Sequence, residues 1–524
     1  MLGARRRSTV AAIVLVAGLS LAAACTQGGG GASSTPGSGS VSGSGSGPSA
    51  SGSTSSSPVA SVTPEQPDPG AKGIDKLNHL IFIVQENRSF DEYFGTFPGA
   101  DGYPLDAQGN IAVCIPNPFV PSTCASPYHD PQQRQIGGPH SYSAHVTSVN
   151  GGKMDGFLQA FLDASQKCPK DTSPNDPSTC GRTTVHPMNV MGYKDESDIP
   201  NYWAYAREYV LQDRMFAASN SWSVPAHLYM VSGWSAKCAS KDPMSCENEG
   251  DAPDTPTSWQ EARYRRLHPN VDPKDYPEFE DPLYAWTDIT YLLHEYGVSW
   301  GYFVHSGLEP DCDEVTGPIT CRPAEQNAQT SNIWNPLPYF QTVKDNKQQK
   351  NVQPMKRFDR AVRMGTLPAV SWVIPSNEVS EHPRSKVSEG QAFVTRTINS
   401  IMKSDLWDST AIFVSWDDWG GFYDHVAPPD IDVNGYGIRV PGLVISPYAK
   451  QGYIDHQTLS HDAYLKFIED VFMNSARIDP ATDGRADKRI SVREDVPILG
   501  DLRDAFDFTQ PPRPPMILDP YPAK

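Results

Sequence analysis

The chain has 524 residues, of which 38% are hydrophobic, so it can bury a substantial core, and its 48 prolines and 41 glycines predict a loop-rich fold. Its formal net charge is −18. Nucleic acid is therefore not expected as a partner, because following its phosphates requires clustered Lys and Arg that we do not find. An anionic substrate stays compatible with this charge, because a bound cation can outweigh a distant negative surface.

The first 25 residues have the pattern of an export signal. Arg5-Arg6-Arg7 precede an apolar run, Val10 to Ala24, that is too short to be a comfortable membrane span. The run ends at Cys25 in a sequence similar to a lipoprotein cleavage box, although Ala22 stands where leucine is usual. We expect export by the general secretory route and membrane attachment through a lipid on Cys25. An ordinary cleavage that releases an extracellular protein is the alternative.

Residues 26–71 consist almost entirely of Gly, Ser, Pro, Ala and Thr, a composition that cannot bury enough apolar surface to fold. We interpret this segment as a disordered tether with a reach of about 35–40 Å. A catalytic domain is expected over residues 72–509, followed by a Pro-rich tail at 510–524.

The chain has nine cysteines, and an even number remains without Cys25, as expected for disulfides in an oxidising compartment. The simplest pairing joins sequence neighbours, so that each bridge closes one local excursion. The pairs would be Cys114–Cys124, Cys168–Cys180, Cys238–Cys246 and Cys312–Cys321.

Short apolar runs predict strands that are covered on both faces. These runs are 80–84, 298–304, 369–374, 411–415 and 442–445. Amphipathic stretches at 391–404 and 463–473 predict surface helices. The pattern indicates an α/β fold with a mainly parallel sheet. The Pro-rich segments 104–182 and 236–330 show little periodicity, and we expect them to decorate the ligand-binding edge of the sheet.

Polar residues follow two of these predicted strands directly. Glu86 and Asn87 come after the first strand, and Asp417 and Asp418 come after the strand at 411–415. The carboxyl ends of strands form the binding crevice of open α/β sheets, and paired carboxylates repel each other unless a cation or proton compensates them. The sequence therefore predicts a metal site, although polar turns and a solvated acidic loop are the simpler interpretations of each pair alone.

Gly420 and Gly421 would let the backbone turn tightly beside this site. Ser223 is the candidate nucleophile, since it lies in a small-residue turn before a predicted helix and could be activated by a metal or a base. His140 and His382 stand in turn-like contexts and could donate to phosphate oxygens or protonate a leaving alkoxide. Weaker candidates are His305, His425 and His461.

Together these motifs resemble the phosphoesterase family that includes the non-specific phospholipases C and the respiratory-burst-inhibiting acid phosphatases. The resemblance spans about residues 78–472 and implies an alkaline-phosphatase-like α/β/α sandwich. The matching motifs lie, in family order, at 86–91, 150–155, 198–203, 223–225, 380–383, 417–426, 439–441 and 465–469.

The resemblance implies that a divalent metal activates a serine nucleophile that attacks phosphorus and forms a phosphoserine. Ca²⁺, Mg²⁺, Mn²⁺ and Zn²⁺ all suit such a site. The implied ligands are Glu86, Asn87, Asp417, Asp418 and the nucleophile Ser223, and the implied phosphate contacts are His140 and His382.

Two positions depart from the family pattern. The family commonly has Pro-Asn-Arg where this chain has Pro225-Ala226-His227, and it often has Glu where this chain has Asp418. We expect the first change to alter the pocket wall and the second to be harmless.

The expected substrate is a phosphate ester, either a phospholipid or a small phosphomonoester. An inactive cell-surface binding protein on the same scaffold is the alternative. A sulfatase is disfavoured because no Cys-x-Pro-x-Arg maturation motif is present.

Overall fold

The computed structural model describes residues 72–523 except 167–186, 269 and 310–323. The predicted export signal, Cys25 and the tether therefore lie outside the described residues. None of the helices in the described ranges combines the length and apolar character needed to cross a membrane.

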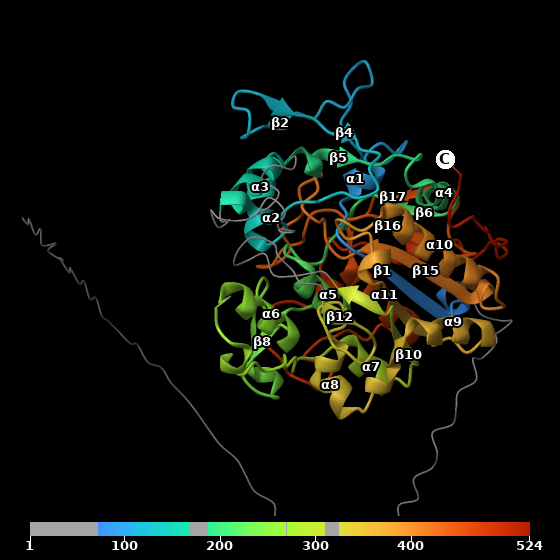
Figure 1. Ribbon diagram of the computed structural model, residues 1–524. Coiled ribbons are helices and arrows are strands. Elements are labelled where there is room, and N and C mark those ends of the chain that lie inside the picture. Colours follow the sequence, from blue (N-terminus) through green and yellow to red (C-terminus); the bar gives the residue numbers. More distant parts are fainter. Residues whose placement is uncertain (1–71, 167–186, 269, 310–323, 524) are drawn as a thin grey trace, which may run out of the picture. The chain divides into compact units, whose positions relative to one another are not determined.

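A mixed sheet of eight strands lies at the centre of the predicted catalytic domain, in the order β13-β10-β14-β1-β15-β16-β6-β17 (Figure 1). The five strands from β13 to β15 are parallel, β16 is antiparallel to both of its neighbours, and β17 is parallel to β6. The predicted mainly parallel sheet is therefore confirmed. The strands are β1 (His79–Gln85), β6 (Val210–Gln212), β10 (Trp300–Val304), β13 (Val352–Pro354), β14 (Val370–Ile374), β15 (Thr410–Trp416), β16 (Gly442–Ile445) and β17 (Tyr453–Asp455).

Helices cover both faces of this sheet. On one face the rings of Phe82 in β1 and Phe413 in β15 lie 5.4 Å and 5.2 Å from the ring of Tyr464 in α11. Neighbouring residues of a strand point to opposite faces, and on the other face Phe303 of β10 packs 5.3 Å from Phe358 in α9. This arrangement confirms the predicted α/β/α layers.

The helices of the described residues include the two that amphipathic patterning predicted, α10 and α11. They are α1 (Phe90–Phe94), α2 (Tyr142–Val149), α3 (Phe157–Gln166), α4 (Pro200–Glu208), α5 (Ser223–Ser232), α6 (Thr257–Leu267), α7 (Ile289–Glu295), α8 (Gln341–Asp345), α9 (Met355–Met364), α10 (Val387–Met402) and α11 (His461–Phe472).

The two decorating segments contain helices that the sequence did not reveal, α2 and α3 in the first and α6 and α7 in the second. The helices α2 and α7 are only 8 and 7 residues long, too short to display an apolar period clearly. Residues of α3 form a second, smaller core with Trp419 and Tyr423 from the loop after β15. This core anchors the loop that carries the predicted acidic pair.

Small two-stranded sheets complete the described chain. They pair β2 (Ile115–Pro116) with β3 (Cys124–Ala125), β4 (Tyr128–His129) with β5 (Gly192–Tyr193), β7 (Met215–Phe216) with β18 (Leu459–Ser460), β8 (Ala236–Cys238) with β9 (Cys246–Asn248), and β11 (Gly307–Glu309) with β12 (Ala324–Gln326).

Two of the predicted disulfides are confirmed. Cys114 is bonded to Cys124 beside the β2–β3 pair, and Cys238 is bonded to Cys246 across the β8–β9 pair. The other two predicted pairs lie outside the described residues.

The Pro-rich tail contacts the same domain as far as Tyr521, whose hydroxyl donates a hydrogen bond to Glu389 at 2.7 Å. Asn201 of α4 donates a hydrogen bond to the Asp519 carbonyl at 2.8 Å, and Asn399 of α10 donates to the Leu518 carbonyl at 2.7 Å. The tail thus lies against two helices.

Candidate active site

The two polar pairs meet at one edge of the sheet because β1 and β15 are adjacent, parallel and in register from His79 opposite Thr410 to Gln85 opposite Trp416 (Figure 1). Both strands therefore end at the same level. The backbone N–H of Asn87 donates to Asp417 Oδ1 at 2.9 Å. All four residues, Glu86, Asn87, Asp417 and Asp418, are fully buried.

Asn87 holds a left-handed backbone conformation with φ of 61°, which asparagine tolerates better than most residues. Its Nδ2 donates to Asp418 Oδ1 at 3.0 Å and lies 3.1 Å from His140 Nε2. Its Oδ1 is buried and has no hydrogen-bond partner among the described residues. This orientation leaves one amide oxygen available to a cation.

Ser223 is the first residue of α5, and its Oγ donates a hydrogen bond to Asp418 Oδ2 at 3.2 Å. The other oxygen of Asp418 accepts from Asn87 and from the Gly420 N–H at 2.7 Å. Asp418 therefore faces the serine, and its position suits it to accept the hydroxyl proton. The positive end of the helix dipole favours negative charge on Ser223 Oγ.

His227 is a site residue that sequence reasoning missed. Its Nε2 lies 3.2 Å from Glu86 Oε1 and 4.0 Å from Asp417 Oδ2, and its side chain is fully buried. The sequence showed this residue only as a departure from a family pattern. Its spacing from Ser223 was the available signal, because residues four apart in a helix share one face.

The residues present fit a divalent cation. One ligand atom each from Glu86, His227 and Asp417 lies within 4.8 Å of the others. Asp417 Oδ2, like Asn87 Oδ1, is buried without a hydrogen-bond partner in the described part of the chain. Two buried carboxylates beside a third acid are costly without compensation, and a cation would supply it. Asp418 lies next to this cluster, on the side of the nucleophile.

Gly420 and Gly421 have φ of 58° and 73°, as the predicted tight turn requires. A Cβ at Gly421 would lie 2.2 Å from the backbone carbon of Gly138, and the Gly138 N–H donates to the Gly420 carbonyl at 2.8 Å. The two loops can approach this closely only because both sides lack side chains. The contact holds His140 beside the acids, with its Nε2 3.8 Å from Asp418 Oδ2.

His382 lies half-buried on a loop that is tied to the same strand end. The Glu86 N–H donates to the Ser380 carbonyl at 2.9 Å, and His382 Nδ1 lies 3.1 Å from the Pro383 carbonyl. Because a carbonyl only accepts, Nδ1 carries the proton in the neutral ring and Nε2 does not.

The loop that carries His382 is anchored by the neighbouring Glu381, which is buried and has φ of 67°. Its carboxylate accepts hydrogen bonds from Tyr202 at 2.6 Å, from Tyr93 at 2.7 Å and from Trp416 Nε1 at 3.2 Å. Burial raises the pKa of Glu381 from 4.5 to about 7, and the three donors offset this only in part. Glu381 is therefore a residue that positions the His382 loop and whose carboxyl has a raised pKa.

The variant Glu381→Gln should remove a pH dependence of stability. A folded-state pKa of about 7 lies above the unfolded value of 4.5, so the protonated carboxyl stabilises the fold below pH 4.5 and this contribution is lost as pH rises through 7. Between pH 5 and 8 the free energy of unfolding of wild type should fall relative to Glu381→Gln by about 2–3 kcal/mol. Urea unfolding at both pH values measures this. The exposed Glu378→Gln is the matched control, and parallel profiles for Glu381→Gln and wild type would contradict the assignment.

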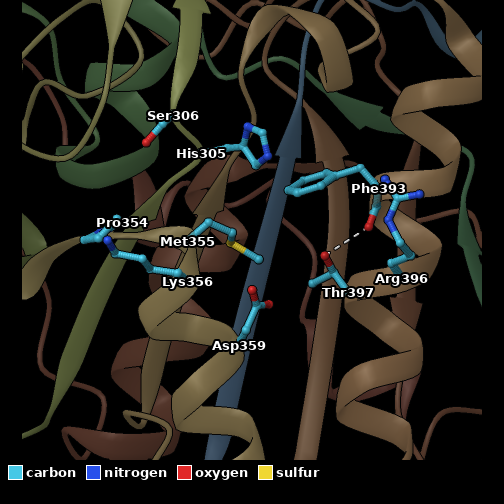
Figure 2. Close-up of a pocket in the computed structure, with 9 residues that line it drawn as sticks. All are labelled: His305, Ser306, Pro354, Met355, Lys356, Asp359, Phe393, Arg396 and Thr397. Carbon is cyan, nitrogen blue, oxygen red and sulfur yellow. Dashed lines mark hydrogen bonds between the residues drawn. The ribbon is translucent and has the colours of Figure 1, made fainter.

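The three weaker histidine candidates, His461, His305 and His425, lie within hydrogen-bond distance of Ser415, Ser376 and Asp91, respectively. His461 is buried, its pKa is lowered to about 4 by burial, and its Nε2 lies 3.4 Å from Ser415 Oγ in β15. It is therefore neutral near pH 7 and belongs to the scaffold. His305 lines a separate cavity of about 440 Å³ between α9 and α10, where its Nδ1 lies 3.0 Å from Ser376 Oγ (Figure 2).

His425 belongs to a buried ion-pair cluster behind the site. Its Nδ1 lies 2.7 Å from Asp91 Oδ2, and Arg439 pairs with Asp91 and Asp424 at 2.9 Å each. The cluster joins α1, the loop after β15 and the segment just before β16. It holds the acidic loop in place.

Comparisons with known proteins point to one family. A family model described as "Phosphoesterase family" matches residues 77–473. Phospholipase C B of Mycobacterium tuberculosis is 26% identical over 488 residues, which cover 84% of this chain and 79% of the relative. Non-hemolytic phospholipase C of Burkholderia pseudomallei is 25% identical over 500 residues, covering 84% and 60%. Non-specific phospholipase C1 of Arabidopsis thaliana is 23% identical over 421 residues, covering 73% and 62%.

Among solved structures, a Vibrio parahaemolyticus protein of the alkaline phosphatase superfamily overlaps with a TM-score of 0.29 and 14% identity, covering 63% of this chain and 78% of its own.

Proposed function

Since this chain belongs to the Phosphoesterase family and is a hydrolase of phosphoric ester bonds, we propose that it acts with a divalent cation and with Ser223 as its nucleophile. The observation that carries the proposal is the contact of Ser223 Oγ with Asp418 Oδ2 at 3.2 Å, beside the buried acids at the ends of β1 and β15. A hydroxyl next to a carboxylate and a cation is a stronger nucleophile than a free serine.

In the proposed reaction Ser223 Oγ attacks phosphorus and its proton passes to Asp418. The new Oγ–P bond forms as the P–O bond to the alcohol breaks, and the leaving alkoxide takes a proton from the imidazolium form of His140 or His382. Water then attacks phosphorus and gives one proton back to that histidine, the Oγ–P bond breaks, and Oγ recovers the proton from Asp418. A cation held by Glu86, Asn87 and Asp417, next to Asp418 and Ser223, would neutralise charge on the phosphoryl oxygens.

The proposed substrate is a phospholipid diester, cleaved to diacylglycerol and a phosphorylated head group. Support comes from the relatives named phospholipase C, two of which align with 84% of this chain. We also propose that the protein is exported and attached to a membrane through Cys25, on the residue pattern of its first 25 residues. Such an enzyme would meet its lipid substrate outside the cell.

Chelation of the cation should stop hydrolysis of phosphatidylcholine, and adding a divalent metal back should restore it. The physical reason is that the transferring phosphoryl group carries charge that Glu86 and Asp417 alone would repel. Release of diacylglycerol and of p-nitrophenol from p-nitrophenyl phosphate, followed in parallel, gives the measurement. Faster turnover of the monoester would indicate an acid phosphatase, and no turnover of either ester would favour a surface binding protein.

A further inference from the structure

The helix α5 begins with Ser223, and it directs a second polar side chain, His227, toward Glu86 and Asp417. We propose that His227 is a ligand of the cation and supplies one nitrogen atom to a site whose other ligands are oxygens. This inference rests on the proposed metal dependence, because it concerns the same ion.

The distances suit a shared ion. Two ligand atoms about 2.0–2.2 Å from one cation, at an angle of about 90–110°, lie about 2.8–3.6 Å apart. His227 Nε2 lies 3.2 Å from Glu86 Oε1 and 4.0 Å from Asp417 Oδ2, so a small adjustment brings all three onto one ion. Each of these three residues offers a ligand atom that lies within 4.8 Å of those of the other two.

The position of His227 in α5 makes this contact rigid. All ten residues of α5 are buried, so the imidazole has no route to solvent. Ser223 lies one helical turn before His227 on the same face. A bond from the cation to His227 would therefore fix the nucleophile relative to the phosphoryl site through a single helix.

A nitrogen ligand changes which cation the site prefers. Imidazole suits zinc and other transition metals, whereas Ca²⁺ and Mg²⁺ favour sites made of oxygen atoms. We expect Zn²⁺ to bind at least about 100-fold more tightly than Mg²⁺. The family commonly has Pro-Asn-Arg where this chain has Pro225-Ala226-His227. Under this proposal the difference alters the metal preference of the site as well as the pocket wall.

The test compares metal affinities of the full chain, measured by calorimetry with Zn²⁺ and Mg²⁺ separately. In His227→Gln the affinity for Zn²⁺ should fall at least about 30-fold, while that for Mg²⁺ changes less than about threefold. Equal losses for both metals would show that His227 only orients Glu86, and unchanged Zn²⁺ affinity would show that it does not contact the ion. Either outcome overturns the proposal.

X-ray absorption of the zinc-loaded wild type and of His140→Gln gives an answer that does not depend on how well His227→Gln folds. Both should show scattering from an imidazole ligand, and its absence from the wild type would overturn the proposal. Its loss in His140→Gln would overturn it too, because the ligand would then be His140. Glu86→Gln distinguishes a failure of the proposed metal site from a failure of the His227 assignment. If this variant binds metals like wild type, the proposed metal site itself is wrong.

Discussion

Ser223→Ala is expected to lower turnover of phosphate esters by about 10⁴-fold or more, because it removes the hydroxyl that donates to Asp418 Oδ2 and that attacks phosphorus in the proposed reaction. The alanine leaves Asp418, Asn87 and His140 in place, so substrate binding should persist while the covalent step is lost. Initial rates with phosphatidylcholine measure the effect. Acid quenching of the wild-type reaction should leave the phosphorylated head group, phosphocholine, on the peptide that contains Ser223.

The matched control is Ser221→Ala, two residues earlier. Ser221 is also buried, but its hydroxyl donates to Asp251 instead of the acidic cluster. This variant should keep activity within about tenfold of wild type if its fold is intact. A Ser223→Ala protein that still turns over, or a phosphoenzyme labelled at another residue, would rule out the nucleophile assignment.

The site could be predicted as far as strand ends could be read from the sequence. Every residue of β1 and β15 is buried, so each appears as a continuous apolar run followed by polar residues. Parallel pairing then brings Glu86 and Asp417 to one edge. The short strands β6 and β17, three residues each, gave no such run and were not predicted.

His227 could not be placed from the sequence for a related reason. All ten residues of α5 are buried, so the helix has no polar stripe from which its phase could be read. The different contacts of the two neighbouring acids could not be predicted from the sequence either. Asp417 and Asp418 are neighbours in sequence, yet Asp417 Oδ2 lies 4.0 Å from His227 Nε2, whereas Asp418 accepts hydrogen bonds from Ser223 and from the Gly420 N–H.

The buried cluster behind the site leads to the largest expected effect on stability. Arg439 pairs with Asp91 and Asp424, and its Nη1 donates to the carbonyls of Asp101 and Asp213 at 2.7 Å each. Arg439→Met should cost about 3–5 kcal/mol of unfolding free energy, because it leaves two buried carboxylates without their guanidinium. Urea unfolding measures this cost. The exposed ion pair of Arg207 with Glu196 provides the control, and Arg207→Met should cost less than about 1 kcal/mol.

The cost of Arg439→Met should also depend on pH. Burial already raises the pKa of Asp424 to about 6 in the wild type, against the opposing effect of Arg439. Without Arg439 that pKa rises further above its unfolded value, so the protonated carboxyl is favoured in the fold and the stability it contributes is lost as pH increases. The variant should therefore lose more stability at pH 8 than at pH 5. An equal loss at both pH values would mean that Asp91 and Asp424 find another cation, for which His425, 2.7 Å from Asp91, is placed.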